Sequence, residues 1–194
     1  MRRFTVPLFV ISVIGLFLSG CFEKNELGPQ LAYLVGYSIL DDRFHTSTRL
    51  DLTADILNQS SQELKFAQLI LTTREGRNFT LDYQDIPPFH QEGRYQAIPL
   101  KTPIANLEIG GTKGVEFRSP DHLHFLFMDA FESAVIKYRN DKGLHELKVD
   151  NLQELIERSR KETIIWMDKE YQEREATLQR LKAEADQRLK KKRK

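Results

Sequence analysis

"RLDLTADI", residues 49–56, alternates polar and apolar residues without a break. Leu50, Leu52, Ala54 and Ile56 would share one face of an extended chain, and the polar residues between them would share the other. A period of two is the pattern of a β-strand with one buried face and one wet face. This stretch therefore predicts such a strand.

Similar extended patterns lie on both sides of it. They are interrupted by polar or glycine- and proline-containing turns: residues 58–63, 75–77, 87–88 and 139–143. The expected strands are residues 31–40, 64–73, 78–83, 94–100, 115–117, 122–128, 133–138 and 144–149. Seven to nine short strands with a turn every eight to twelve residues predict a β-sandwich or a small barrel. Helical periodicity is absent from this body, which argues against a βαβ enzyme fold.

The run LTADILNQSSQELKFAQLILTT, residues 52–73, resembles the two-strand core of small immunoglobulin-like envelope domains. In those domains a strand ends in an Asn-led polar turn, and the next strand begins with Leu. The resemblance implies a mainly β protein, with an antiparallel immunoglobulin-like β-sandwich over residues 31–150.

The pattern changes after Asp150. Asp150 or Asn151 can cap a helix, and Glu154 lies where a capping-box carboxylate would sit for an Asn151 cap. Apolar residues then recur in steps of three, four and seven. Residues 151–194 are therefore expected to form a long charged helix, about 58 Å from residue 152 to residue 190. We expect its first half to pack on the sandwich through Leu155, Ile156, Ile165 or Trp166, and its second half to project.

The helix ends in a strongly basic segment. Its cations are Arg188, Lys190, Lys191, Lys192, Arg193 and Lys194. Residues 151–194 hold 13 Lys and Arg against 9 Asp and Glu, whereas residues 21–150 hold 14 against 19. This asymmetry favours a contact with an anionic lipid, lipopolysaccharide or the cell wall. The alternative is a frayed, solubilising helix end.

The first twenty residues have the order of a secretory signal peptide. Arg2 and Arg3 precede the apolar run PLFVISVIGLFL, residues 7–18, which is shorter than the roughly 20 residues of a membrane-spanning helix. The next residues complete Leu18-Ser19-Gly20-Cys21, which resembles the lipobox of bacterial lipoproteins. The resemblance implies removal of residues 1–20, diacylation of the Cys21 thiol, and a polar tether over residues 21–30.

The same resemblance predicts where the protein resides. It implies a bacterial membrane, with the protein anchored by lipid and facing the periplasm. Phe22 follows the anchor, where lipoproteins kept at the inner membrane typically carry Asp, so the outer membrane is favoured. Cys21 is the one cysteine of the chain, so the mature protein is expected to contain no disulfide.

Two histidines are weak candidates for a metal site. His122 and His124 lie two residues apart and would share one strand face, opposite Leu123 and Phe125. Zinc needs three or four ligands, so His45 or His90 would have to join them. The alternative is a pair of solvent-facing histidines. The sequence predicts no metal and no cofactor other than the covalent lipid.

Catalytic motifs are absent from the sequence: it contains no Gly-x-Ser-x-Gly, no His-Glu-x-x-His and no phosphate-binding glycine loop before a helix. Residues 110–114, GGTKG, are expected to form a flexible turn. Asp41 with Asp42, and Asp82 with Asp85, are expected to solvate loops.

The leading hypothesis is a non-enzymatic envelope lipoprotein that binds a protein partner through its sandwich and basic helix. One alternative is a structural linker between the membrane and the cell wall or another anionic envelope surface. Another is a small-ligand or metal-binding protein or an enzyme, using the His122 and His124 face or a pocket near Pro87-Pro88. No nucleic-acid partner is expected, because the signal peptide would keep the mature chain away from the nucleoid.

Overall fold

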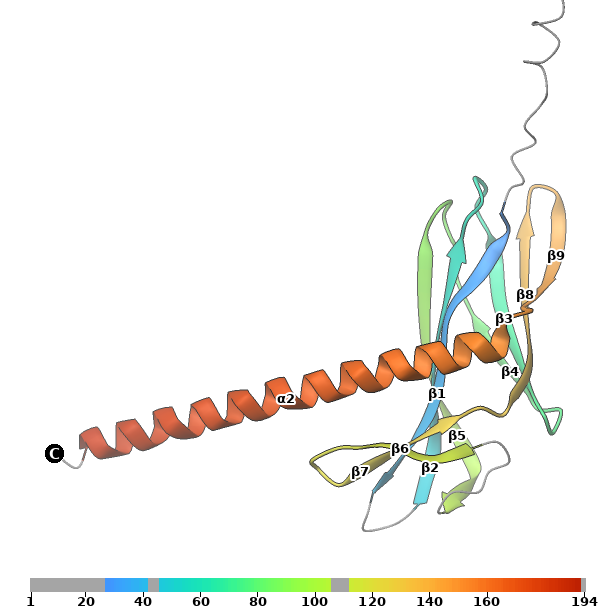
Figure 1. Cartoon of the computed structure of the whole chain (residues 1–194). Coiled ribbons are helices and arrows are strands. Elements are labelled where there is room, and N and C mark those ends of the chain that lie inside the picture. Colours follow the sequence, from blue (N-terminus) through green and yellow to red (C-terminus); the bar gives the residue numbers. More distant parts are fainter. Residues whose placement is uncertain (1–26, 42–45, 106–111, 193–194) are drawn as a thin grey trace, which may run out of the picture.

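The computed structural model describes residues 27–41, 46–105 and 112–192 (Figure 1). Two antiparallel sheets are followed by one long helix, which confirms the predicted sandwich and C-terminal helix. The first sheet consists of β5 (Gln91–Ala105), β2 (Thr46–Asn58), β1 (Pro29–Asp41), β7 (Leu123–Met128) and β6 (Thr112–Arg118), in that order. The second sheet consists of β4 (Asn78–Asp82), β3 (Lys65–Thr73), β8 (Phe131–Asn140) and β9 (Gly143–Lys148). The helix is α2 (Leu152–Lys192).

The main core lies between the two sheets. Leu52, Ala54 and Ile56 of β2 are fully buried there, as the alternation of residues 49–56 predicted. The second sheet contributes the fully buried side chains of Leu69, Leu71, Phe131, Ala134 and Ile136. Burial of aliphatic and aromatic surface from both sheets is the dominant force that holds such a sandwich together.

A bulge in β1 sets which side chains point into this core. The pairing register between β1 and β2 shifts between Leu31 and Tyr33. One extra residue in a strand changes which face the later side chains occupy. As a result Leu34 is buried in the main core, whereas Tyr33 and Val35 belong to a second apolar cluster on the outer face of the first sheet.

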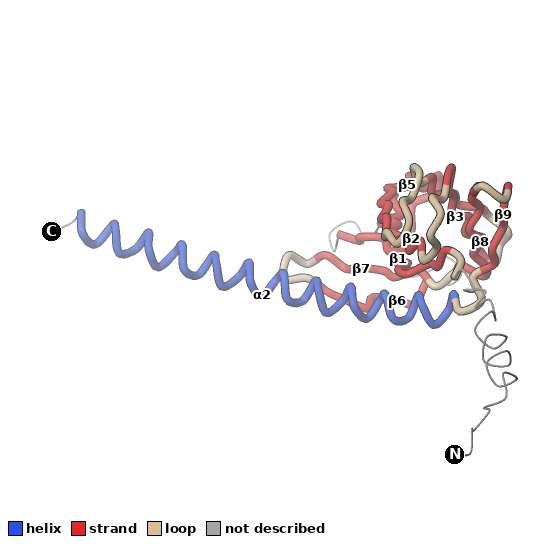
Figure 2. Tube along the Cα trace, turned by 90° about the horizontal axis from the view of Figure 1, so that it is seen from above, coloured by secondary structure: helices blue, strands red, loops and turns tan. Residues whose placement is uncertain are grey.

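Helix α2 covers that outer face and forms a third layer (Figure 2). It begins at Leu152, directly after Asn151, whose carbonyl oxygen accepts the amide of Leu155 at 3.1 Å. Its first turns contribute Leu152, Leu155 and Ile156 to the main core. Further along, Met167 packs with β1 and β7.

The predicted helix contacts were half right. Leu155 and Ile156 are buried as expected, but Ile165 and Trp166 are 68% and 61% exposed. The residues that face the sheet instead follow helical spacing through Ser159, Thr163 and Met167. Ile165 and Trp166 lie two positions and one position before Met167, which turns them about 200° and 100° away from it. Among the described residues, no helix is both long and apolar enough to span a bilayer.

Candidate functional site

The predicted histidine pair does not share one strand face. His122 precedes β7 and adopts a left-handed φ of 61°, so only His124 is a strand residue. His124 is paired with Leu40 of β1 and therefore points to the same face as Leu40, which is buried. Of the two histidines expected to face solvent, His122 is exposed, whereas His124 is half-buried. His124 lies on the face of β7 opposite the one on which Phe125 and Phe127 pack with Met167 of α2.

The other proposed metal ligands do not join these histidines. His45 lies outside the described residues, and His90 is exposed in the segment before β5, 3.8 Å from the carboxylate of Glu92. Within residues 27–41, 46–105 and 112–192, no group of three or more His, Cys, Asp or Glu side chains is arranged to hold a metal ion.

Several other residues considered from the sequence have structural partners. The Asp82 carboxylate accepts a hydrogen bond from Gln68 at 2.7 Å, and that of Asp85 accepts the amide of Phe66 at 3.3 Å. The carbonyl of Pro87 accepts the side-chain amide of Asn58 at 2.9 Å. Thr112–Gly114 belong to β6, so the expected turn over 110–114 is wrong for these three residues; Gly114 has a φ of 52° beside a register shift. Gly110 and Gly111 lie outside the described residues.

The first half of α2 is fixed to the sandwich by polar as well as apolar contacts. The Ser159 hydroxyl accepts the amide of Leu34 at 3.2 Å, and Arg158 donates to the carbonyl of Ala32 at 3.2 Å. The hydroxyls of Tyr33 and Thr163 are hydrogen-bonded to each other. Burial raises the pKa of Tyr33, so its phenol stays protonated and able to donate at neutral pH.

A groove of about 300 Å³ lies beside these contacts, between α2 and the outer face of the first sheet. Its lining residues are Tyr33, Val35, Tyr37, Thr53, Glu162, Thr163, Trp166 and Met167. Three aromatic rings and one carboxylate could accommodate a small planar or cationic group. Sequence reasoning missed this groove because its walls come from segments about 130 residues apart.

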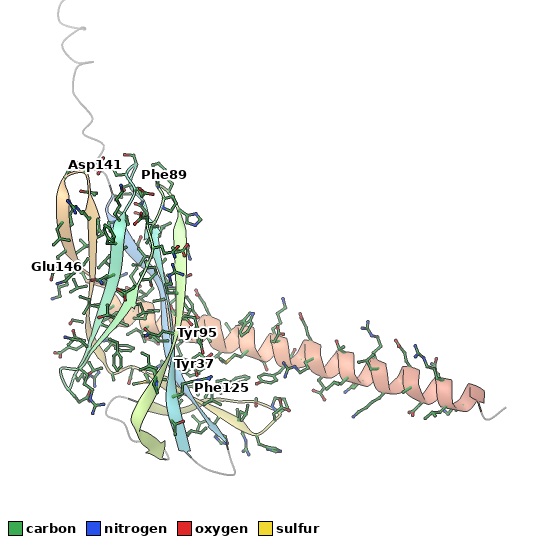
Figure 3. The ribbon with its side chains drawn as sticks, turned by 180° about the vertical axis from the view of Figure 1, so that it is seen from behind. Tyr37, Phe89, Tyr95, Phe125, Asp141 and Glu146 are labelled. Carbon is green, nitrogen blue, oxygen red and sulfur yellow. The ribbon has the colours of Figure 1, made fainter. Side chains whose placement is uncertain are left out.

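A polar cluster continues the outer face from β1 to β5. Asp51 is only 2% exposed, and its carboxylate binds the Arg49 guanidinium at 3.1 Å and the Tyr95 hydroxyl. The hydrogen bond to Asp51 raises the pKa of Tyr95, and burial raises that of Tyr37. Figure 3 shows Tyr95, Tyr37 and Phe125 in succession near the level at which α2 crosses. The face predicted to be wet is thus partly covered, and its buried carboxylate is satisfied by local partners.

The second half of α2 leaves the sandwich. The Tyr171 ring stacks on Phe117 with centroids 5.7 Å apart, and Arg174 lies 3.9 Å from the carboxylate of Asp121. Every residue from Gln172 to Lys190 is exposed. Figure 1 shows this half extending far to one side of the sheets. We call residues 175–192 the projecting segment.

The projecting segment carries an apolar stripe. Leu178, Leu181 and Leu189 are 51%, 52% and 56% exposed, and Ala185 lies between them in the sequence. At 100° per residue these four positions fall within about 80° of the helix circumference. The cations predicted to contact anions follow: Arg188 and Lys190 are exposed, Lys191 and Lys192 end the helix, and Arg193 and Lys194 lie outside the described residues.

Comparison of the chain with protein-family models, with curated proteins and with solved structures found no match. The likeness to immunoglobulin-like envelope domains and the lipobox therefore stay predictions from the sequence. Cys21 lies outside the described residues.

Proposed function

We propose that this protein is a lipid-anchored, non-enzymatic binding module of a bacterial envelope, and that its sandwich presents the projecting segment to a protein partner. The observation that carries this proposal is the division of α2. Its first half is held by the core and by side-chain hydrogen bonds, whereas residues 172–190 are exposed throughout.

Helix energetics supports this assignment. An isolated helix of about 18 residues is marginal in water, because the first turn is costly to nucleate. Here the docked half supplies the nucleus, so the projecting segment can remain helical and keep a fixed direction. A solvent-exposed helix does not require aligned leucines for its folding, yet the projecting segment carries the stripe. Amphipathic helices bind partner grooves or partner helices through side chains spaced in this way.

The predicted lipid attachment supports the same role as a binding module. Acylation of Cys21 would hold the sandwich at a membrane, since each buried methylene contributes about 0.8 kcal/mol and two chains give stable anchoring. The predicted site is the inner leaflet of the outer membrane, facing the periplasm. A tethered module with a helix held at a fixed angle is suited to bringing an envelope protein close to that membrane.

Photo-crosslinking in intact cells tests the stripe. A photoreactive residue at Ala185 lies within the stripe, and one at Gln187 lies about 200° around the helix from Ala185. We expect a defined adduct from position 185, a much weaker one from 187, and loss of the 185 adduct in the Leu178→Ser, Leu181→Ser double variant. Equal capture from both positions would contradict a stripe-directed partner.

Truncation supplies the matching loss-of-function experiment. The chain should end after Arg174, because the contacts of Tyr171 with Phe117 and of Arg174 with Asp121 belong to the docked half. We expect this shortened protein to keep the melting temperature of the parent and to lose the partner. A truncated protein that retains the partner would place the binding surface elsewhere.

A second candidate function is linkage to an anionic envelope surface. It is favoured by the position of the basic end, which the helix places about 27 Å beyond Arg174. Sedimentation with purified peptidoglycan in low and high salt tests it, because contacts between exposed charges are screened by salt. Substitution of Arg188 and Lys190–Lys194 by Gln should remove any salt-sensitive co-sedimentation.

A further inference from the structure

One end of the sandwich is defined by the start of β1, and we call it the proximal end. In the first sheet Pro29 is paired with Asn58, and Leu57 with Gln91. In the second sheet Lys65 is paired with Arg139, which is paired with Leu144. The β8–β9 hairpin and the segment before β5 therefore reach the same end, where Figure 3 shows Phe89 and Asp141.

The proximal end carries exposed apolar side chains. Leu144, Phe66 and Phe89 are 80%, 72% and 72% exposed, the highest values for large apolar residues in the described part of the chain. Leu27, 64% exposed, lines a hollow of about 990 Å³ together with Phe89 and Lys142. Apolar side chains gathered at one end of a molecule mark a contact with a protein or a membrane.

The backbone conformation of the two phenylalanines is unusual. Phe66 has a φ of 52° and Phe89 a φ of 55°, in the left-handed region. Bulky residues rarely adopt this conformation, whereas Gly or Asn adopts it readily. A large aromatic side chain that is solvent-exposed and sits on strained backbone contributes little to the fold. Such a side chain points to a contact outside the molecule.

Local hydrogen bonds hold both phenylalanines in place. The amide of Phe66 donates to the Asp85 carboxylate at 3.3 Å, next to a register shift in β3. Phe89 precedes His90, whose carbonyl accepts the amide of Asn58 at 2.8 Å. The two rings are therefore presented outward by an ordered backbone.

We propose that the proximal end is a membrane-contacting surface, and that Phe66, Phe89 and Leu144 enter the boundary between headgroups and acyl chains of the bilayer that anchors the protein. This proposal rests on the proposed acylation of Cys21. Leu27 follows Cys21 by six residues, which span at most about 22 Å. The proximal end is thus confined near the bilayer, with little room for a folded partner between them.

The charges at this end indicate an apolar contact. Lys65 lies 3.8 Å from the carboxylate of Glu63, and Lys142 follows Asp141 at the hairpin turn. With both signs side by side, the surface has little net attraction for anionic lipid. Interfacial segments commonly bury their apolar face about 5–10 Å into the membrane boundary, a depth that single Phe and Leu side chains can reach.

The orientation has a consequence for α2. With the proximal end on the bilayer, the strands point away from the membrane surface. Helix α2 crosses the strands, so it extends along the membrane surface (Figures 1 and 2). The end of α2 at Lys192 then lies to the side of the sandwich, away from the proximal end.

Fluorescence of the anchored full-length protein tests the contact. Single cysteines at Phe89 and Leu144 report on the proximal end, and those at Trp166 and Leu181, 61% and 52% exposed, serve as matched controls elsewhere. Each is labelled with an environment-sensitive maleimide dye, and the protein is placed in vesicles of phosphatidylethanolamine, phosphatidylglycerol and brominated lipid. We expect quenching at 89 and 144 only. Equal, water-like emission at all four positions would overturn the proposal.

The same preparation separates this proposal from the acylation on which it rests. A parent protein acylated on Cys21 has no thiol left for the dye, whereas labelling of the parent shows that acylation has failed. The surface is then tested by vesicle flotation of the Cys21→Ser protein. Phe66→Ser with Phe89→Ser should lower its partition about tenfold, and Trp166→Ser should leave it unchanged. Equal flotation of these variants, or a lack of flotation of every one, would contradict the proposal that the proximal end contacts the membrane.

Discussion

The hydroxyl oxygen of Ser159 on α2 accepts a hydrogen bond from the backbone amide of Leu34 on β1 at 3.2 Å, and both residues are fully buried. β7 pairs with β1 only from Tyr37 to Asp41. The earlier part of that edge of β1 is instead met by helix side chains, since Arg158 also donates to the carbonyl of Ala32. The helix thus satisfies backbone groups that a neighbouring strand would otherwise pair, which is one way in which proteins protect a sheet edge.

Ser159→Ala should destabilise the protein by about 1–3 kcal/mol, because the amide of Leu34 would be left buried without a partner. The measurement is thermal or urea unfolding of the purified protein. Thr177→Ala is the matched control, since that hydroxyl donates to the carbonyl of Glu173 on the exposed half of α2. A Ser159→Ala protein as stable as Thr177→Ala would show that the bond does not hold the helix.

Asn58→Ala should be among the most destabilising polar substitutions, costing about 3 kcal/mol. The Asn58 side chain is fully buried, and its nitrogen lies 2.8, 3.1 and 2.9 Å from the carbonyl oxygens of Gln62, Ile86 and Pro87. Its oxygen accepts the amide and hydroxyl of Ser60 at 3.0 and 2.7 Å.

Asn58→Asp should be equally harmful, because a carboxylate has no N–H to donate and its oxygens would repel the three carbonyl oxygens. Gln59→Ala is the control, since that side chain donates to the carbonyl oxygen of the exposed Gln30 side chain at 2.9 Å. Unfolding in urea should separate both Asn58 variants from it. Asn58→Asp with parental stability would contradict the role assigned to the side-chain amide.

Phe66→Gly should raise the free energy of unfolding by about 0.5–1 kcal/mol. A non-glycine residue in the left-handed region costs about 1–2 kcal/mol, and glycine gives back part of that gain through its larger unfolded-state entropy. The exposed ring loses little packing. Phe66→Ala, which keeps the strained φ, should show no such gain in the same unfolding experiment, so equal stabilities would contradict the strain argument.

Stability should fall in alkali because of buried tyrosine. Burial raises the pKa of Tyr83 well above the ordinary tyrosine value of about 10, and its hydroxyl donates to the carbonyl of Ala54 at 2.9 Å. Above about pH 10 the phenol of Tyr83 ionises in the unfolded chain but stays protonated in the folded chain. Ionisation therefore favours the unfolded state, and the free energy of unfolding falls as pH rises above about 10.

The melting temperature measured from about pH 9 to pH 11 checks this prediction. Tyr83→Phe should be less stable than the parent at neutral pH by about 1 kcal/mol and should show a shallower alkaline decline. Parallel pH profiles for the two proteins would contradict the assignment to Tyr83.

Local sequence determined much of this architecture. The alternation of residues 49–56 predicted β2, the cap at Asp150 or Asn151 predicted the start of α2, and the Gly143 turn predicted the β8–β9 hairpin. Periodicity and turn chemistry act over a few residues, so a strand, a cap or a hairpin can be read from the residues that form it.

Tertiary structure alone decided which faces are covered. Contacts between distant segments bury Asp51 and both faces of β7 and leave Trp166 exposed. They also form the groove at Tyr33 and bring Phe66 and Phe89 to one end of the sandwich. A strand pattern states which side chains share a face, but the layer packed on that face comes from elsewhere in the chain. Here that layer is the first half of α2, about 120 residues after β1. The apolar spacing of the helix does not indicate which strands it will pack on.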